Sequence, residues 1–177
     1  MPTKPLRILI LILLLLLALA GCKKAPHAAA VSSSPQTPPG VKSTPLKIEL
    51  TAIPAGFRPV AGAVDPIRLT SADGGEITIA RGTSTDLAAA ARNEEARLGG
   101  LPQGRSLGSI ELLCQFGRAL LTRGLYRDEG GTETEEIRIS LVAARPLVLA
   151  YRYPAAGSRR QRLDQALAVL RSLQPVT

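Results

Sequence analysis

The chain contains few of the residues that build the commonest catalytic and metal centres. Its 177 residues include no tryptophan, one histidine (His27) and two cysteines (Cys22 and Cys114). His27 lies in a segment rich in proline and small residues, so residues 46–177 contain no histidine for a Ser-His-Asp or Cys-His pair, or for zinc ligation. We therefore expect a protein that is not an enzyme, with no catalytic residue, no metal ligand and no cofactor.

Aromatic residues and clustered positive charges are also scarce. The chain has two phenylalanines and three tyrosines, and its arginines are scattered although the formal net charge is +8. Part of that charge belongs to the N-terminal segments, because Lys4, Arg7, Lys23, Lys24 and Lys42 all precede residue 46. A nucleic-acid interface needs a basic stripe, usually with stacking aromatic residues. We expect no nucleic-acid partner.

The one long apolar run is too short for a membrane-spanning helix. It covers residues 8–20, whereas a spanning helix needs about 20 apolar residues. Lys4 and Arg7 precede the run and small residues end it, which is typical of a secretory signal peptide. An uncleaved anchor helix, or a plain secretory signal with a coincidental cysteine, is the alternative interpretation.

The end of this run, Leu19-Ala20-Gly21-Cys22, closely resembles the lipobox of bacterial lipoproteins. The resemblance implies cleavage between Gly21 and Cys22 and a diacylglyceryl thioether on Cys22. Two or more acyl chains would hold the chain stably at a membrane, because each buried methylene contributes about 0.8 kcal/mol. We therefore expect a lipid-anchored protein on the periplasmic side of the bacterial cell envelope. Lys23 follows the cysteine where an inner-membrane protein would carry aspartate, which favours the outer membrane.

The remaining chain divides into a tether and one domain. Residues 22–45 interleave proline with Ala, Ser, Thr and Gly and have no apolar periodicity, which predicts a flexible tether behind the lipidated cysteine. Residues 46–177 are enough for a single domain with a core of its own. Cys114 has no intramolecular partner if Cys22 is acylated, so no disulfide is expected.

Alternation and helical periodicity predict an α+β domain. A hairpin is expected across the Asp73-Gly74-Gly75 turn, because such turns require positive φ. The first helix should begin at a Ser84 or Thr85 cap and end at Gly99-Gly100, and the second should begin with a Ser158/Gln161 capping box and end at Pro175. Strands are expected at 46–51, 67–70, 76–79, 110–116, 118–126, 135–143 and 147–153, the last three as an antiparallel meander.

Several segments of this domain resemble the PsbP-like fold, which the extrinsic photosystem subunit shares with the DcrB-like bacterial lipoproteins. The resemblance implies an α/β/α sandwich around an antiparallel sheet and a role in interaction or assembly, with no catalytic residues. The segment after the first expected strand differs from that family, because Phe57 stands where the family often has Trp. The segments that carry the resemblance are Gly117-Arg118-Ala119, Tyr126 with its acidic turn, Val148–Pro154 and Leu170-Arg171-Ser172-Leu173.

Three other features have two interpretations each. Cys114 is expected to be a small buried hydrophobe, the alternative being a reactive thiol. The carboxylates around the Gly130-Gly131 turn are expected to be solvated hairpin charges, the alternative being a calcium site. Arg159, Arg160 and Arg162 place positive charge at the start of the last helix, where it opposes the helix dipole. They are either solvated or contact an anionic partner.

We therefore expect a domain that binds a protein partner or assists assembly while Cys22 holds it at the membrane. The alternative is a module that binds a small apolar or lipidic ligand between the sheet and the helices.

Overall fold

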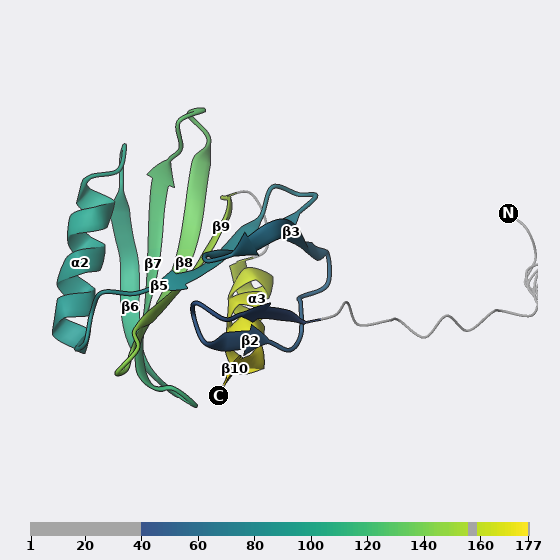
Figure 1. Cartoon of the computed structure of the whole chain (residues 1–177). Helices are drawn as coiled ribbons and strands as arrows, with labels where there is room; N and C mark the ends of the chain where they lie inside the picture. Colours follow the sequence, from purple (N-terminus) through teal and green to yellow (C-terminus); the bar gives the residue numbers. More distant parts are fainter. Residues whose placement is uncertain (1–39, 156–158, 177) are drawn as a thin grey trace, which may run out of the picture. The chain divides into compact units, whose positions relative to one another are not determined.

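The computed structural model describes residues 40–155 and 159–176 (Figure 1). These residues belong to one compact unit, Thr37–Thr177. The expected signal peptide, Gly21, Cys22, most of the expected tether and Ser158 lie outside the described residues, so those predictions stay predictions. Within the described residues, no helix is long and apolar enough to cross a membrane.

A seven-stranded, fully antiparallel sheet forms the centre of the unit. Its strand order is β3-β4-β5-β9-β8-β7-β6. The consecutive strands β7 to β9 lie side by side, which confirms the predicted meander, and β6 extends it by one strand. The strands are β3 (Phe57–Val64), β4 (Ile67–Ser71), β5 (Glu76–Arg81), β6 (Arg105–Cys114), β7 (Gly117–Arg127), β8 (Glu133–Val142) and β9 (Leu147–Pro154).

The predicted hairpin is the pair β4–β5. Its turn closes with a bond from the Ser71 amide to the Gly75 carbonyl at 2.9 Å, and Gly74 takes a φ of 82°. Glycine adopts that conformation without steric cost, which is why this turn forms where Asp-Gly-Gly stands. Strand β3 was not predicted. It is a sheet edge, where proline is tolerated because one row of backbone groups has no partner strand.

Helix α2 (Leu87–Gly99) begins one residue later than a Thr85 cap predicts and two residues later than a Ser84 cap predicts. Asp86 is the cap, and its side chain accepts a hydrogen bond from the Ala89 amide at 2.7 Å. Ser84 instead bonds the Asn93 side chain at 2.9 Å. The prediction of a Ser84 or Thr85 cap was therefore wrong, because the carboxylate of Asp86 occupies the capping position.

A second sheet of three short strands joins distant parts of the chain. Strands β1 (Val41–Ser43), β2 (Ile48–Leu50) and β10 (Leu173–Pro175) have the order β1-β2-β10. Strand β1 thus lies inside the segment predicted as tether. Helix α3 (Arg159–Ser172) ends directly before β10. The last residues of the predicted second helix therefore form a strand instead.

The two helices lie on opposite faces of the large sheet, as Figure 1 shows. On one face, α3 and the small sheet share a single apolar core with the large sheet, including Leu50, Ile139, Leu149 and Val169. On the other face, α2 packs against β6, β7 and β8. Gly124 of β7 permits this approach, because a side chain there would strike Leu98 of α2. The arrangement is the predicted α+β fold.

Candidate functional site

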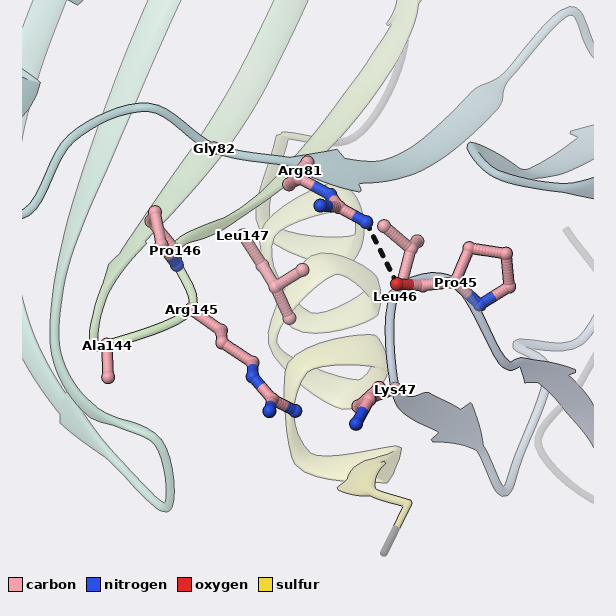
Figure 2. Close-up of a pocket in the computed structure, with 9 residues that line it drawn as sticks. All are labelled: Pro45, Leu46, Lys47, Arg81, Gly82, Ala144, Arg145, Pro146 and Leu147. Carbon is pink, nitrogen blue, oxygen red and sulfur yellow. Dashed lines mark hydrogen bonds between the residues drawn. The ribbon is translucent and has the colours of Figure 1, made fainter.

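A pocket opens where three turns or strand ends meet, and Figure 2 shows the residues that line it. The turn between β1 and β2 forms one wall, the end of β5 forms the second, and the turn between β8 and β9 forms the third. The cavity volume is about 340 Å³. Its lining residues are Pro45, Leu46, Lys47, Arg81, Gly82, Ala144, Arg145, Pro146 and Leu147.

Gly82 fixes two of these walls against each other. Its amide donates to the Pro146 carbonyl at 2.8 Å, which extends the β5–β9 pairing by one residue. A β-carbon at position 82 would lie 3.2 Å from both the Pro146 carbonyl carbon and the Leu147 nitrogen. The residue is therefore glycine because the two backbone segments approach closely here.

The first wall, between β1 and β2, is a tight turn held at both ends. The Ser43 hydroxyl accepts a hydrogen bond from the Leu46 amide at 3.2 Å and itself donates to the Val64 carbonyl. Lys47 has a φ of 55°, a left-handed conformation that is uncommon for residues other than glycine. Its carbonyl accepts from the Val176 amide at 2.9 Å, so the strained residue is tied to the chain beyond β10.

Three cations border the pocket without an opposing carboxylate. The lining residues include Lys47, Arg81 and Arg145 and no acidic residue. Within the described part of the chain, none of the three forms an ion pair. The Nη2 atom of Arg81 donates to the Pro45 carbonyl at 3.0 Å, which orients that guanidinium (Figure 2). Arginines paired with carboxylates elsewhere are Arg97, Arg118, Arg123, Arg138, Arg152 and Arg162.

The floor of the pocket is apolar. Leu46 and Leu147 are both 5% exposed and belong to the main core. In Figure 2 the Leu147 side chain lies between the Arg145 and Arg81 side chains. Positive groups around an apolar floor suit a ligand that has a negative group and an apolar part.

Sequence reasoning missed this pocket. Lys47, Arg81 and Arg145 lie on three separate turns or strand ends and belong to no local motif. The only local signal is a run of polar or small residues at each turn, which does not show which turns share one end of the sheet. The β5–β9 pairing brings Arg81 and Arg145 together, and the β1–β2 turn of the small sheet adds Lys47.

A layer of buried ion pairs lies between α2 and the large sheet. Arg138 Nε lies 2.6 Å from Glu94 Oε1, and Arg97 Nη2 lies 2.5 Å from Glu136 Oε2. Arg152 Nε donates to Glu136 Oε1 at 3.0 Å. Glu135 and Glu136 are fully buried, so the expectation of solvated hairpin charges was wrong for these two residues. They are buried because β8 is an interior strand, and arginines neutralise them there.

The expected anionic contact at the start of α3 involves residues that the structure places differently. Arg160 is exposed, whereas Arg162 turns inward and pairs with Asp73 at 2.6 Å. Arg162 Nη1 also donates to the Tyr151 hydroxyl at 2.8 Å, and its guanidinium lies 5.2 Å from the Tyr153 ring centroid. The side chain of Arg159 lies outside the described residues. An anionic contact at these arginines stays a prediction.

Cys114 is half-buried at the β6–β7 turn, where its thiol donates to the Gly117 carbonyl at 3.4 Å. It is therefore less buried than expected, because β6 is a sheet edge. Among the described residues, no group of His, Cys, Asp and Glu side chains is placed to hold a metal ion.

Comparison with models of known families gives no match, and comparison with curated proteins gives none. Solved structures do share the fold. The chain is similar to cyanobacterial PsbP (CyanoP) from Synechocystis sp. PCC 6803, with a TM-score of 0.52 and 12% identity over 85% of this chain and 99% of that one. It is also similar to LpqN of Mycobacterium tuberculosis, described as involved in cell envelope biogenesis, with a TM-score of 0.51 and 17% identity over 73% of this chain and 83% of that one. These likenesses show a PsbP-like fold.

Proposed function

We propose that this protein is a lipid-anchored component of the bacterial cell envelope whose domain is a non-catalytic binding module. The segment Leu19-Ala20-Gly21-Cys22 supports the anchor, because a cysteine directly after an apolar run and small residues is the site of lipoprotein acylation. The shared fold of LpqN, a protein of envelope biogenesis, is in keeping with that location.

The observation that carries the binding role is the three-walled pocket. Its lining residues offer cations and apolar side chains but no carboxylate, imidazole, thiol or hydroxyl group. Lys47 is the one nucleophilic side chain of the lining, and no carboxylate or imidazole lines the pocket beside it to act as a general base. The pocket is therefore suited to hold a partner and not to convert one.

The anchor is tested with the full-length chain expressed in a bacterium beside a Cys22→Ser variant. We expect the wild type to lose residues 1–21, gain the mass of acyl chains and fractionate with membranes. The variant should keep its leader or remain unacylated and leave the membrane fraction. Identical mass and fractionation of the two chains would show that Cys22 is not acylated.

The binding role is tested by a photo-crosslinking residue placed at Ala144, which is exposed at the pocket rim. The matched control places the same residue at Ala72, which is exposed in the β4–β5 turn away from the pocket. We expect a discrete crosslinked product in living cells from position 144 and not from position 72. Equal patterns from the two positions would contradict a binding role for the pocket.

A second candidate role is the binding of a small apolar or lipidic ligand. A groove of about 260 Å³ lies between the β6–β7 turn and α3, and its apolar lining includes Leu112, Leu167 and Leu170. Leu113 borders it and is 85% exposed. Native mass spectrometry of the purified chain should show a bound apolar molecule, and Leu113→Ser should reduce its occupancy while Ile110→Ser on the same strand should not.

A further inference from the structure

From the pocket geometry we infer that the ligand of the proposed binding module carries a phosphate group, held by Lys47, Arg81 and Arg145. This inference names the ligand class for the role proposed above and rests on it. Three cations from three separate segments border one opening, and none is neutralised within the described part of the chain.

The number of positive groups favours phosphate over carboxylate. A phosphate group carries a charge of about −1.5 to −2 as a monoester and −1 as a diester, with several acceptor oxygens in either form, whereas a carboxylate carries −1 and has two oxygens. Guanidinium groups match phosphate oxygens with paired N–H donors, and an ammonium group adds a point charge. Two arginines and one lysine supply both kinds of contact.

The pocket is preorganised for such a group. The Arg81 guanidinium is oriented by its bond to the Pro45 carbonyl, and the Gly82–Pro146 bond holds the second wall against the third. Lys47 is kept in a left-handed conformation by a turn bonded at Ser43 and at Val176. Like charges that are gathered in a concave surface attract counter-ions from solution, so an anion relieves their mutual repulsion.

The volume of the cavity exceeds what a free phosphate ion needs, and its floor is formed by Leu46 and Leu147. The phosphate is therefore expected to be an ester with an organic part that contacts these side chains. Two sources offer this chemistry: a soluble phosphate ester and the headgroup of an anionic phospholipid.

The test uses the full chain in a neutral detergent, titrated with glycerol 3-phosphate by calorimetry. Arg145→Gln is the main variant, because Arg145 is exposed and its side chain forms no hydrogen bond or ion pair among the described residues. Arg68→Gln is the control, since it removes the same charge from an exposed strand position outside the pocket. We expect Arg145→Gln to raise Kd about ten-fold, as the loss of one charge-assisted hydrogen bond does, and Arg68→Gln to leave it nearly unchanged.

The second arm places the same chains in phosphatidylcholine nanodiscs with and without phosphatidylglycerol. Hydrogen exchange is followed at residues 44–47 and 143–147. Protection that depends on phosphatidylglycerol and is lost in Arg145→Gln supports the inference with the lipid headgroup as source. Titration by glycerol 3-phosphate without such protection supports it with a soluble ester as source.

The inference is overturned if neither probe binds, or if Arg68→Gln weakens binding as much as Arg145→Gln. Failure of the Cys22→Ser test leaves the titration interpretable, because the calorimetric arm needs no membrane attachment. A failed titration leaves the anchor and the crosslinking results intact. The two proposals therefore fail separately.

Discussion

Glu136 on β8 and Arg97 on α2 form an ion pair of 2.5 Å although the glutamate side chain is completely buried. The same carboxylate accepts from Arg152 of the neighbouring strand, which lies directly opposite in the sheet register. One buried charge thus links a helix and two strands. Removing one partner of a buried pair is costly, because the other charge loses its compensation.

We expect Glu136→Gln to lower the free energy of unfolding by about 3 kcal/mol. Arg97 and Arg152 are partly exposed and retain some hydration, so the loss should not exceed the usual range for such pairs. Chemical denaturation followed by circular dichroism measures it. Glu129→Gln in the exposed β7–β8 turn is the control and should change stability by less than about 0.5 kcal/mol; equal losses would refute the network's role.

The environment of Asp73 predicts that the stability of the fold decreases at acid pH. Its pKa is lowered from 3.8 to about 2, first by the hydrogen bond from the Ser71 hydroxyl and next by that from Arg162. A carboxyl group whose pKa is lower in the folded state than in the unfolded state contributes its full stabilisation at pH values above the unfolded-state pKa. That contribution is lost as the pH falls from about 4 to about 2.

We therefore expect Asp73→Asn to be less stable than the wild type at neutral pH and to lose less stability on acidification. Urea denaturation at about pH 5 and about pH 2 measures the difference. Wild type and variant should converge at the lower pH. A constant gap between them at both pH values would show that the Asp73 charge does not stabilise the fold.

The buried tyrosines predict that the fold loses stability at alkaline pH. Burial raises the pKa of Tyr126, Tyr151 and Tyr153 above the ordinary value of about 10, and the nearby Glu135 carboxylate raises that of Tyr153 further. A group whose pKa is higher in the folded state than in the unfolded state stabilises the protein at pH values below the unfolded-state pKa. That contribution is lost as the pH rises above the unfolded-state pKa. Stability should therefore fall above about pH 10.

The chain has no tryptophan and three tyrosines, so near-ultraviolet absorbance reports these groups alone. We expect a weak tyrosinate signal at about pH 10 while the protein is folded, and a signal from about half of the tyrosines in concentrated guanidinium chloride at the same pH. Equal tyrosinate absorbance in the folded and unfolded chains at that pH would contradict the burial of these hydroxyls.

Two nearby glycines should respond oppositely to alanine. A β-carbon at Gly104 would overlap the Leu98 carbonyl oxygen, whereas one at Gly99 would meet no atom within 4 Å. We expect Gly104→Ala to lower the free energy of unfolding by about 2 kcal/mol and Gly99→Ala to raise it by about 0.5 kcal/mol, since alanine favours the helix. Thermal denaturation of both variants checks the sign; a shared sign would contradict the packing of α2 described above.

Much of the fold was predictable because its signals are local. The β4–β5 hairpin follows from alternation around Asp73-Gly74-Gly75, and β6 to β9 follow from apolar runs separated by turn residues. Strands β1 and β10 were missed because three residues carry too little periodicity, and they exist only through pairing with β2. The burial of Glu136 was missed because its compensation by Arg152 depends on the strand register.

The candidate site was not predictable for a related reason. Arg81 and Arg145 become neighbours through the β5–β9 pairing, and Lys47 joins them only through the placement of the small sheet. Sequence reasoning instead singled out Arg159, Arg160 and Arg162, whose positive charges are adjacent in the chain. Of these, Arg162 is used internally by Asp73 and Tyr151.

Because β2 pairs with β10, the small sheet can be completed only after β10 has been synthesised. Leu50 lies opposite Leu173 and Ile48 opposite Pro175, so these bonds join residues that are synthesised far apart in time. The small sheet therefore cannot close until residues 173–175 have been added, and closing so long a loop costs entropy that only the completed core offsets. Until then the edge of β2 that pairs with β10 has no partner strand, and Leu50 lacks the neighbour that the finished sheet gives it.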